Sequence, residues 1–165
     1  MISEVLALLA ASAAAPAPAA TPLPELPVFA TADCASADSR AKVLSSPFAD
    51  GSYEERLENY VDARAQGTLG RLDHTDISAE QRRAILDATL MSPEFASTTD
   101  ENARRDAALE PHFKTLESNP SDAEACRALV HISGEIHAML LSVAAQWDRL
   151  ALTIDREIAR TEENH

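Results

Sequence analysis

Basic residues are scarce in this 165-residue chain, which has 14 Lys and Arg against 27 Asp and Glu and a formal net charge of −13. A charge of that sign repels the phosphates of nucleic acid and the anionic surface of a membrane. The composition therefore excludes nucleic acid and membrane surfaces as expected partners.

Glycine and aromatic residues are also few, with 4 glycines and 4% aromatics in a chain that is 45% hydrophobic. Sheets depend on aromatic and β-branched pairs, whereas chains rich in Ala and Leu favour helices. A chain of this length forms one ordinary domain. We expect an all-α domain, built as a helical bundle of short helices packed on one very long C-terminal helix.

The motifs of common catalytic and cofactor sites are absent from the sequence. There is no C-x-x-C, haem attachment site, Walker loop, G-x-G-x-x-G, H-E-x-x-H, G-x-S-x-G or calcium loop. No cofactor and no enzymatic activity are therefore expected. A distant alternative is a hydrolytic site on the loop from Gly67 to Ser78, because Asp73, His74 and Ser78 are the residue types of a catalytic triad.

The N-terminus resembles a secretory signal peptide. Val5 to Ala15 is an uninterrupted run of Val, Leu, Ala and one Ser, too short to span a bilayer. Ala17-Pro18-Ala19 is a small-x-small cleavage site, so residues 1–19 are predicted to be removed. The mature protein is then periplasmic or secreted, and no membrane span is expected after cleavage.

A linker precedes the folded domain. Five of the nine prolines lie between Pro16 and Pro27, and each fixes φ and removes an amide donor. Residues 20–33 are therefore predicted to be an extended tether, and residues 34–165 to form the α-helical domain.

Helix boundaries can be predicted from capping patterns. Three S-x-x-E/Q boxes begin at Ser52, Ser78 and Ser121. The predicted helices are listed by range: Ser39 to Leu44; Tyr53 to Gln66, stopped by Gly67 and Gly70; Ala79 to Met91, ending before Ser92-Pro93; and Asp100 to Leu116, interrupted or restarted at Pro111.

The strongest pattern is a predicted helix over about residues 121–161. Such a helix is about 60 Å long, and its apolar residues fall within an arc of about 100°, repeating every eleven residues. The part of this stripe that we predict to be an interaction face consists of Met139, Val143, Trp147, Leu150, Ile154 and Ile158.

The predicted short helices, at about 20 Å each, cover only about two-thirds of the long one. We therefore expect the end from Leu150 to Ile158 to be exposed. An exposed apolar row is typical of an interaction site, which indicates a protein partner or a homo-oligomer. The function predicted on this basis is an exported, acidic, helical interaction or structural protein of a bacterial-type envelope or periplasm. The alternative is a small-ligand or metal-binding helical bundle, in which the same stripe lines the interior.

The two cysteines, Cys34 and Cys126, have different expected roles depending on the compartment. In an oxidising compartment an even pair is expected to join, here closing a loop of about ninety residues that stabilises the fold by about 4 to 5 kcal/mol. A redox role is the alternative, but the spacing favours a structural disulfide.

A metal site is not expected. His131 and Glu135 are four residues apart and share a helix face, whereas His137 points away from His131. These two weak candidates supply at most two ligands, and a structural metal site needs four.

Overall fold

The computed structural model describes residues 22–25, 27, 29–73 and 77–163. Within these residues there are helices and no strands, so the expected all-α class is confirmed. The elements are η2 (Thr31–Cys34), α2 (Ala37–Leu44), α3 (Ser52–Asp73), α4 (Ala79–Leu90), α5 (Pro93–Ser118) and α6 (Ala123–Glu163). The predicted signal peptide and cleavage site lie outside the described residues, as do parts of the predicted linker.

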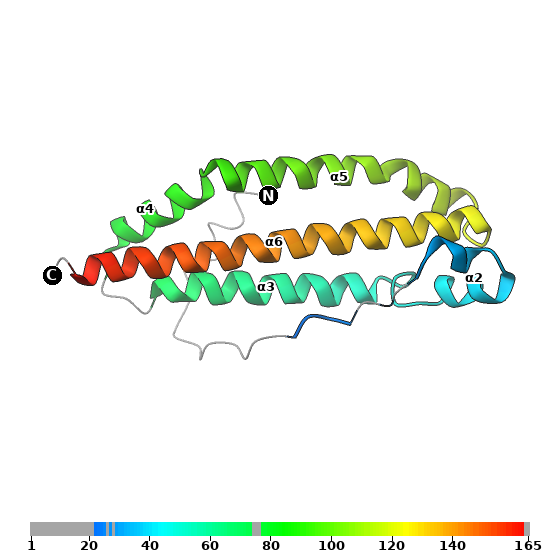
Figure 1. Cartoon of the computed structure of the whole chain (residues 1–165), viewed down its shortest axis with the longest axis horizontal. Coiled ribbons are helices and arrows are strands. Elements are labelled where there is room, and N and C mark those ends of the chain that lie inside the picture. Colours follow the sequence, from blue (N-terminus) through cyan, green and yellow to red (C-terminus); the bar gives the residue numbers. More distant parts are fainter. Residues whose placement is uncertain (1–21, 26, 28, 74–76, 164–165) are drawn as a thin grey trace.

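The long helix α6 has 41 residues and confirms the helix expected over about residues 121–161. Helices α3 and α5 each pack along α6 and make no comparable contact with each other. In Figure 1, which looks down the shortest axis of the molecule, α6 runs between them. The three helices therefore form a single layer with α6 in the middle.

Three buried clusters follow one another along α6. The first joins η2 and α2 to the beginning of α6 through Cys34, Val43, Cys126 and Leu129. The second joins α3 to the middle of α6 through Tyr53, Leu57, Tyr60, Val61 and Ala144. The third joins the end of α3 and Ile77 to the last turns of α6 through Leu72, Ile77, Leu150 and Ile154. Each cluster thus contains a segment of α6, which makes this helix the common support of the core.

Helix α3 is longer than the predicted helix from Tyr53 to Gln66, because it runs through Gly67 and Gly70 to Asp73. Thr68 and Leu72, which alternate with the glycines, are both buried. Packing of this last part on α6 outweighs the helix-breaking tendency of two glycines, which costs about 1 kcal/mol each. The prediction that the glycines stop the helix was wrong.

Helix α5 likewise continues through Pro111, where an interruption was predicted. Proline removes one helical hydrogen bond and bends a helix without necessarily ending it. Leu109 is buried before the proline and Leu116 packs on the first cluster after it. Packing on both sides of Pro111 holds the two parts in one helix, which bends towards α6 near this end (Figure 1).

The capping box at Ser78 is confirmed. The Ser78 hydroxyl accepts from the Gln81 N–H at 3.2 Å, and the Gln81 side chain accepts from the Ser78 N–H at 2.8 Å. The box predicted for Ser52 is wrong, because Ser52 is the first residue of α3 and its N–H donates to Asp50 Oδ1 at 2.9 Å.

The box predicted for Ser121 is wrong for a similar reason. Asp122 caps α6 instead, with Oδ1 accepting from the N–H groups of Glu124 and Ala125, both at 2.8 Å. A carboxylate at this position also complements the positive end of the helix dipole.

The two shortest helices agree with their predicted ranges to within two residues. Helix α4 ends at Leu90, one residue before the predicted Met91. Helix α2 begins at Ala37, because the Ser36 hydroxyl accepts from the Ser39 N–H at 3.1 Å and caps the helix there.

Candidate interaction face

One side of α6 is occupied by α3, and polar contacts fix their alignment. Arg64 of α3 pairs with Asp148 of α6 at 3.1 Å. Seven residues, or two turns, further along both helices, Arg71 pairs with Asp155. The Thr68 hydroxyl donates to the Trp147 carbonyl at 3.2 Å. Exposed ion pairs contribute little stability, about 0 to 1 kcal/mol, so their main effect is to set the register of α3 on α6.

A tyrosine supports the first of these arginines. The guanidinium of Arg64 lies over the Tyr60 ring at 4.3 Å from its centroid and donates to a Tyr60 hydroxyl. This hydrogen bond raises the pKa of Arg64. The arginine therefore stays charged at any pH at which the fold persists.

The contact between α3 and α6 also contains a partly buried polar pair. The Tyr53 hydroxyl and Nδ1 of His137 share a hydrogen bond of 2.6 Å. Burial raises the pKa of Tyr53 and lowers the pKa of His137. Both groups are thus kept neutral near pH 7, and the pair serves packing more than charge.

The opposite side of α6 faces α5 through a more polar contact. Arg105 of α5 lies 3.8 Å from Glu135 of α6, and Gln146 of α6 donates to the Phe95 carbonyl at 3.2 Å. Among the described side chains of α5, Leu109 alone is fully buried. The α5 side is therefore held by fewer apolar contacts than the α3 side.

Between these two sides, the apolar stripe of α6 is open in the middle. Ile136, Met139, Leu140, Val143 and Trp147, which we call the middle stripe, are all half-buried. Leu140, Val143 and Trp147 pack in part against the second cluster, which contains α3. At 100° per residue the residues of the middle stripe lie between the positions that contact α3 and those that contact α5. No fourth helix of the described chain covers them, since α2 and η2 lie at one end of α6 and α4 at the other.

The end of the stripe is not exposed as predicted. Leu150 is 1% exposed and Ile154 is fully buried, and Ile158 packs against the same cluster. The prediction failed because α3 is longer than expected, so that Leu72 reaches this end of α6, and because Ile77 and Ile85 add a further cover. Of the predicted interaction face, Met139, Val143 and Trp147 therefore remain half-buried, while Leu150 and Ile154 belong to the core.

The reverse face of α6 is mixed in character. Its exposed residues include Arg127, Gly134, Ala145, Leu152 and Arg156, of which Leu152 is an apolar side chain that is 59% exposed. The middle stripe is continuously apolar, whereas Leu152 on the reverse face lies among charged and small residues.

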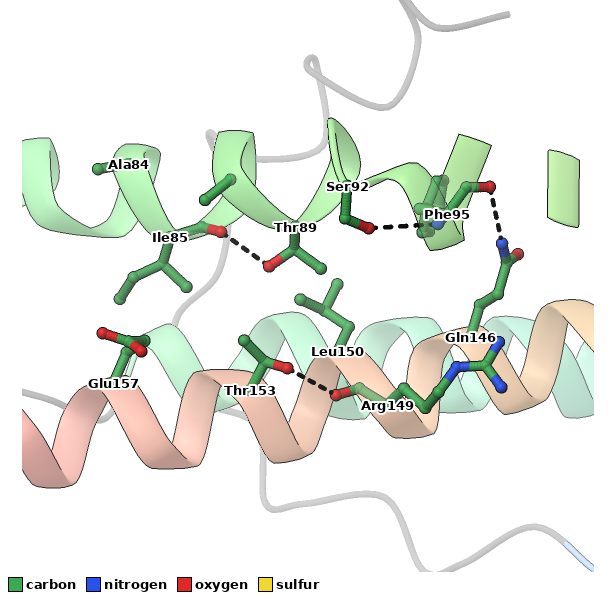
Figure 2. Close-up of a pocket in the computed structure, with 11 residues that line it drawn as sticks. Ala84, Ile85, Thr89, Ser92, Phe95, Gln146, Arg149, Leu150, Thr153 and Glu157 are labelled. Carbon is green, nitrogen blue, oxygen red and sulfur yellow. Dashed lines mark hydrogen bonds between the residues drawn. The ribbon is translucent and has the colours of Figure 1, made fainter. Parts of the chain in front are cut away.

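A pocket of about 390 Å³ lies between α4, the start of α5 and the last third of α6 (Figure 2). Ile85, Phe95 and Leu150 give it apolar walls, and Arg149 and Glu157 place charges of both signs at its lining. Pockets that bind small molecules have volumes from about 300 Å³ upwards. This pocket is the place in the fold that best fits the alternative prediction of a ligand-binding bundle.

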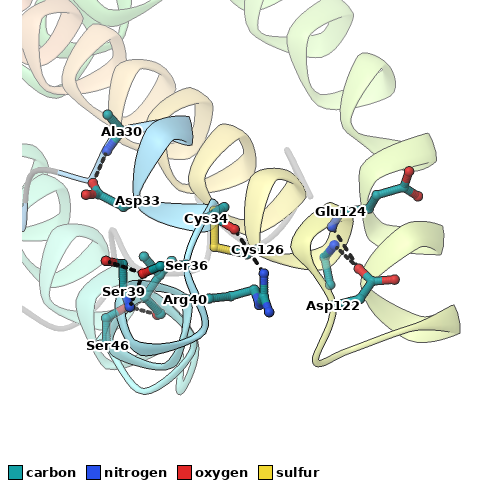
Figure 3. Close-up of a disulfide and its surroundings, with 12 residues drawn as sticks. Ala30, Asp33, Cys34, Ser36, Ser39, Arg40, Ser46, Asp122, Glu124 and Cys126 are labelled. Atoms are coloured by element: carbon teal, nitrogen blue, oxygen red, sulfur yellow. Dashed lines mark hydrogen bonds between the residues drawn. A yellow bond between two sulfur atoms is a disulfide. The ribbon is translucent and has the colours of Figure 1, made fainter.

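The predicted disulfide is present. Cys34 and Cys126 are bonded, with Cα atoms 5.7 Å apart and a sequence separation of 92 residues. Figure 3 shows the bond joining η2 to the first turns of α6, with Arg40 donating to the Cys34 carbonyl at 3.1 Å. The bond is buried, so its position indicates a structural role.

The metal candidates His131 and Glu135 are not brought into one site. His131 lies beside His112 of α5, whose ring centroid is 4.3 Å from its own, whereas Glu135 lies beside Arg105. Among the described residues, no group of three or more His, Cys, Asp or Glu side chains is arranged to hold a metal.

The hydrolytic alternative is not assembled in the described part of the chain. Asp73 pairs with Arg82 at 3.4 Å, and Ser78 caps α4. His74 lies outside the described residues.

The role of α5 was not predicted. Phe95, Asn102, Leu109 and Leu116 recur every seven residues, which is the period of a helix packed along another helix. Reading that period across Pro111 would have predicted one long helix and would have placed His112 on its inner side.

By length and composition alone, one described helix, α6 over Ala123–Arg160, could cross a membrane. Comparison of the chain with protein-family profiles, with curated protein sequences and with solved structures gives no match.

Proposed function

We propose that this protein is an exported helical interaction protein, and that the middle stripe of α6 is covered by a second copy of the chain. The observation that carries the proposal is the single-layer arrangement of α3, α6 and α5 with an apolar, half-buried strip along its centre. Stable domains bury their apolar faces between two layers of secondary structure. A second layer therefore completes the core.

The size of the face suits a stable dimer. Helix α3 has 22 residues, so three helices spaced about 10 Å apart offer a face of about 33 by 30 Å, or about 1,000 Å² per copy. A stable interface buries about 800 Å² of accessible surface per partner, so a second copy would have to cover most of this outline. The apolar centre of this face and its polar margins match the usual anatomy of an interface.

Charge does not oppose this contact at its flanks. The net charge of −13 repels two copies at long range. Beside the middle stripe, however, acidic groups of α6 are paired with arginines: Asp148 with Arg64 and Glu135 with Arg105.

The same contacts favour a water-exposed protein over a membrane span for α6. Both sides of α6 carry ion pairs to charged helices, through Arg64 on one side and Arg105 on the other. Charged side chains are expensive within a bilayer. The core helix of a water-exposed domain has this same length and apolar composition.

Export is supported by the disulfide and by the signal-like N-terminus. Disulfides persist in oxidising compartments and are rare in a reducing cytosol. Cleavage after Ala19 gives a mature chain that begins at Ala20, which the intact mass of the periplasmic or secreted fraction measures directly. Recovery of the uncleaved chain from the cytosol alone would contradict this part of the proposal.

The dimer is tested by light scattering coupled to size exclusion, with two matched variants. Met139→Glu places a charge in the middle stripe, and Ala145→Glu places the same charge on the exposed reverse face of α6. We expect a dimer for the native chain and for Ala145→Glu, and a monomer for Met139→Glu, with the helical circular dichroism unchanged in all three.

Two results would count against a second copy. A native chain that remains monomeric at 0.5 mM, roughly the range of weak interfaces, would refute it. A dimer that persists in Met139→Glu would show that the contact lies elsewhere.

The second candidate function is small-ligand binding, which the pocket beside α4 favours. Ala88→Trp would fill this pocket, whereas Ala103→Trp adds the same side chain at an exposed site of α5. A ligand-binding role predicts that an amphipathic dye binds the native chain and Ala103→Trp but not Ala88→Trp. Equal binding by all three would remove this candidate.

A further inference from the structure

Two histidines from different helices face each other at one end of the molecule. His112 of α5 and His131 of α6 have ring centroids 4.3 Å apart, with ring planes inclined by 54°. His131 is exposed and His112 is half-buried, so water reaches the pair. Neither ring is hydrogen-bonded to another residue in the described part of the chain, which leaves the nitrogen lone pairs available.

The fold brings this pair together from residues 19 positions apart in sequence. Helix α5 bends at Pro111, and Leu109 and Leu116 fix it against α6 on either side of His112. His131 lies on the side of α6 that carries Glu135, which faces Arg105 of α5. Both imidazoles are thus held on rigid helices, without a loop in the site.

We propose that His112 and His131 bind one divalent transition-metal ion of the imidazole-preferring class, namely Zn²⁺, Ni²⁺ or Cu²⁺. The two imidazoles are the protein ligands, and water completes the coordination. Neutral imidazole nitrogen is a preferred ligand of these ions. Two protein ligands define an open site, unlike the closed four-ligand sites of structural zinc.

The observed ring separation suits this role. A metal–nitrogen bond of about 2.0 to 2.1 Å places each ring centroid about 3.2 Å from the ion. Two ligands at about 90°, as on Ni²⁺ or Cu²⁺, then have centroids about 4.5 Å apart, and two tetrahedral ligands of Zn²⁺ have centroids about 5.2 Å apart. The observed separation is 4.3 Å. The ring separation therefore matches neighbouring ligands of Ni²⁺ or Cu²⁺ most closely, and Zn²⁺ requires the rings to move apart by about 1 Å.

The surroundings favour a cation and limit competing ligands. The chain has a net charge of −13, which attracts cations. Both cysteines are in the disulfide, so no free thiol competes for the metal. His137 is engaged by Tyr53 on the α3 side of α6.

Metal binding at this position would join α5 to α6. Leu109 is the one fully buried side chain among those described in α5, so this helix has few other anchors. A ligand that binds only the folded state stabilises it by mass action. The site therefore predicts a metal-dependent rise in the melting temperature.

The test uses the full chain without a histidine tag, in a His74→Ala/His165→Ala background that removes the two histidines outside the described residues. Titration calorimetry with ZnCl₂ and NiCl₂ measures the affinity, and circular dichroism measures the Tm. We expect one ion per chain and a Tm increase of roughly 5 to 10 °C when the free metal is a hundredfold above Kd.

Two site variants and one control decide the assignment. His112→Gln and His131→Gln should each weaken binding at least tenfold and remove the Tm increase, while Glu135→Gln, whose carboxylate faces Arg105, should bind within about threefold of the background chain. Each variant is first shown to keep the Tm of the background chain in the absence of metal, so that a loss reports binding. Electron paramagnetic resonance of the Cu²⁺ form should show two coupled nitrogens.

Several results would overturn the proposal: no binding by the background chain, binding that is unchanged in His131→Gln, or a Cu²⁺ spectrum with no imidazole nitrogen. If the His131→Gln substitution alters the Tm in the absence of metal, the number of coupled nitrogens in the Cu²⁺ spectrum of the background chain decides the assignment.

Discussion

Breaking the Cys34–Cys126 bond should destabilise the whole domain, because the bond closes most of the folded chain into one loop. The sequence separation is 92 residues. Loop closure of this length removes about 15 to 16 cal/mol/K of entropy from the unfolded chain, which is about 4.6 kcal/mol at 25 °C. For a domain of this size, the corresponding fall in Tm is roughly 10 to 18 °C.

The assay is urea unfolding followed by circular dichroism, with and without reductant. Mass spectrometry after alkylation confirms that the bond is broken in the reduced sample. Cys34→Ala, Cys126→Ala and the double variant should lose similar free energies of unfolding, because each removes the same bond. Additive losses from the two single variants would show that packing of the separate side chains dominates.

A second result would show that loop closure does not stabilise the whole domain, even though the disulfide is present. If reduction unfolds only η2 and α2, hydrogen exchange will rise in Thr31–Leu44 and the midpoint of global unfolding will not move. The disulfide would then anchor a local segment and contribute little to the stability of α3, α5 and α6.

Further predictions concern single side chains. Ile154→Ala should lower the free energy of unfolding in urea by about 2 to 5 kcal/mol, because the side chain is fully buried. The control Leu152→Ala, at a side chain 59% exposed, should change it by less than about 0.5 kcal/mol. Equal losses would contradict the burial of Ile154. Gly70→Ala should stabilise the domain by about 0.5 to 1 kcal/mol, since a methyl group there meets no atom within 4 Å, and a measured loss would mean that the backbone at this turn is not helical. Burial lowers the pKa of His137, so the unfolded chain binds the proton more readily than the folded chain does. The Tm should therefore fall as the pH drops below about 6.5 and through the lowered pKa. His137→Gln should flatten this part of the plot of Tm against pH. An unchanged slope in that variant would assign the pH dependence to other groups.

The long helix and the disulfide could be predicted from sequence because their signals are local or few. The apolar stripe of α6 follows from helical period alone, and the two cysteines allow one intramolecular pairing. The Ser78–Gln81 box likewise depends on four consecutive residues. Signals confined to one helix turn or one residue pair do not require knowledge of the tertiary fold.

The errors in helix length share a tertiary cause, whereas the Ser52 and Ser121 boxes failed locally, because Asp50 and Asp122 accept from nearby backbone N–H groups instead. Gly67, Gly70 and Pro111 are local signals that end or interrupt helices, yet the buried residues beside them pack on α6 and keep the helices intact. The expectation of an exposed Ile154 followed from the shorter predicted helices, so that one error in length produced a second error in burial.

The candidate site was predictable only in part. Met139, Val143 and Trp147 were assigned to an interaction face from sequence, and they remain half-buried in the fold. The pairing of His112 with His131 was not foreseen, because it depends on the direction of α5 after Pro111. To predict contacts between antiparallel helices, one must know the topology of the fold as well as the helical period.

The place of α6 in the fold has a consequence for the order of folding. Helices α3, α4 and α5 each have their main partner in α6, and they have few partners among themselves. All three precede α6 in the chain. They therefore cannot bury their apolar sides until α6 has been synthesised, so the part of the chain before α6 should not fold into a stable domain by itself.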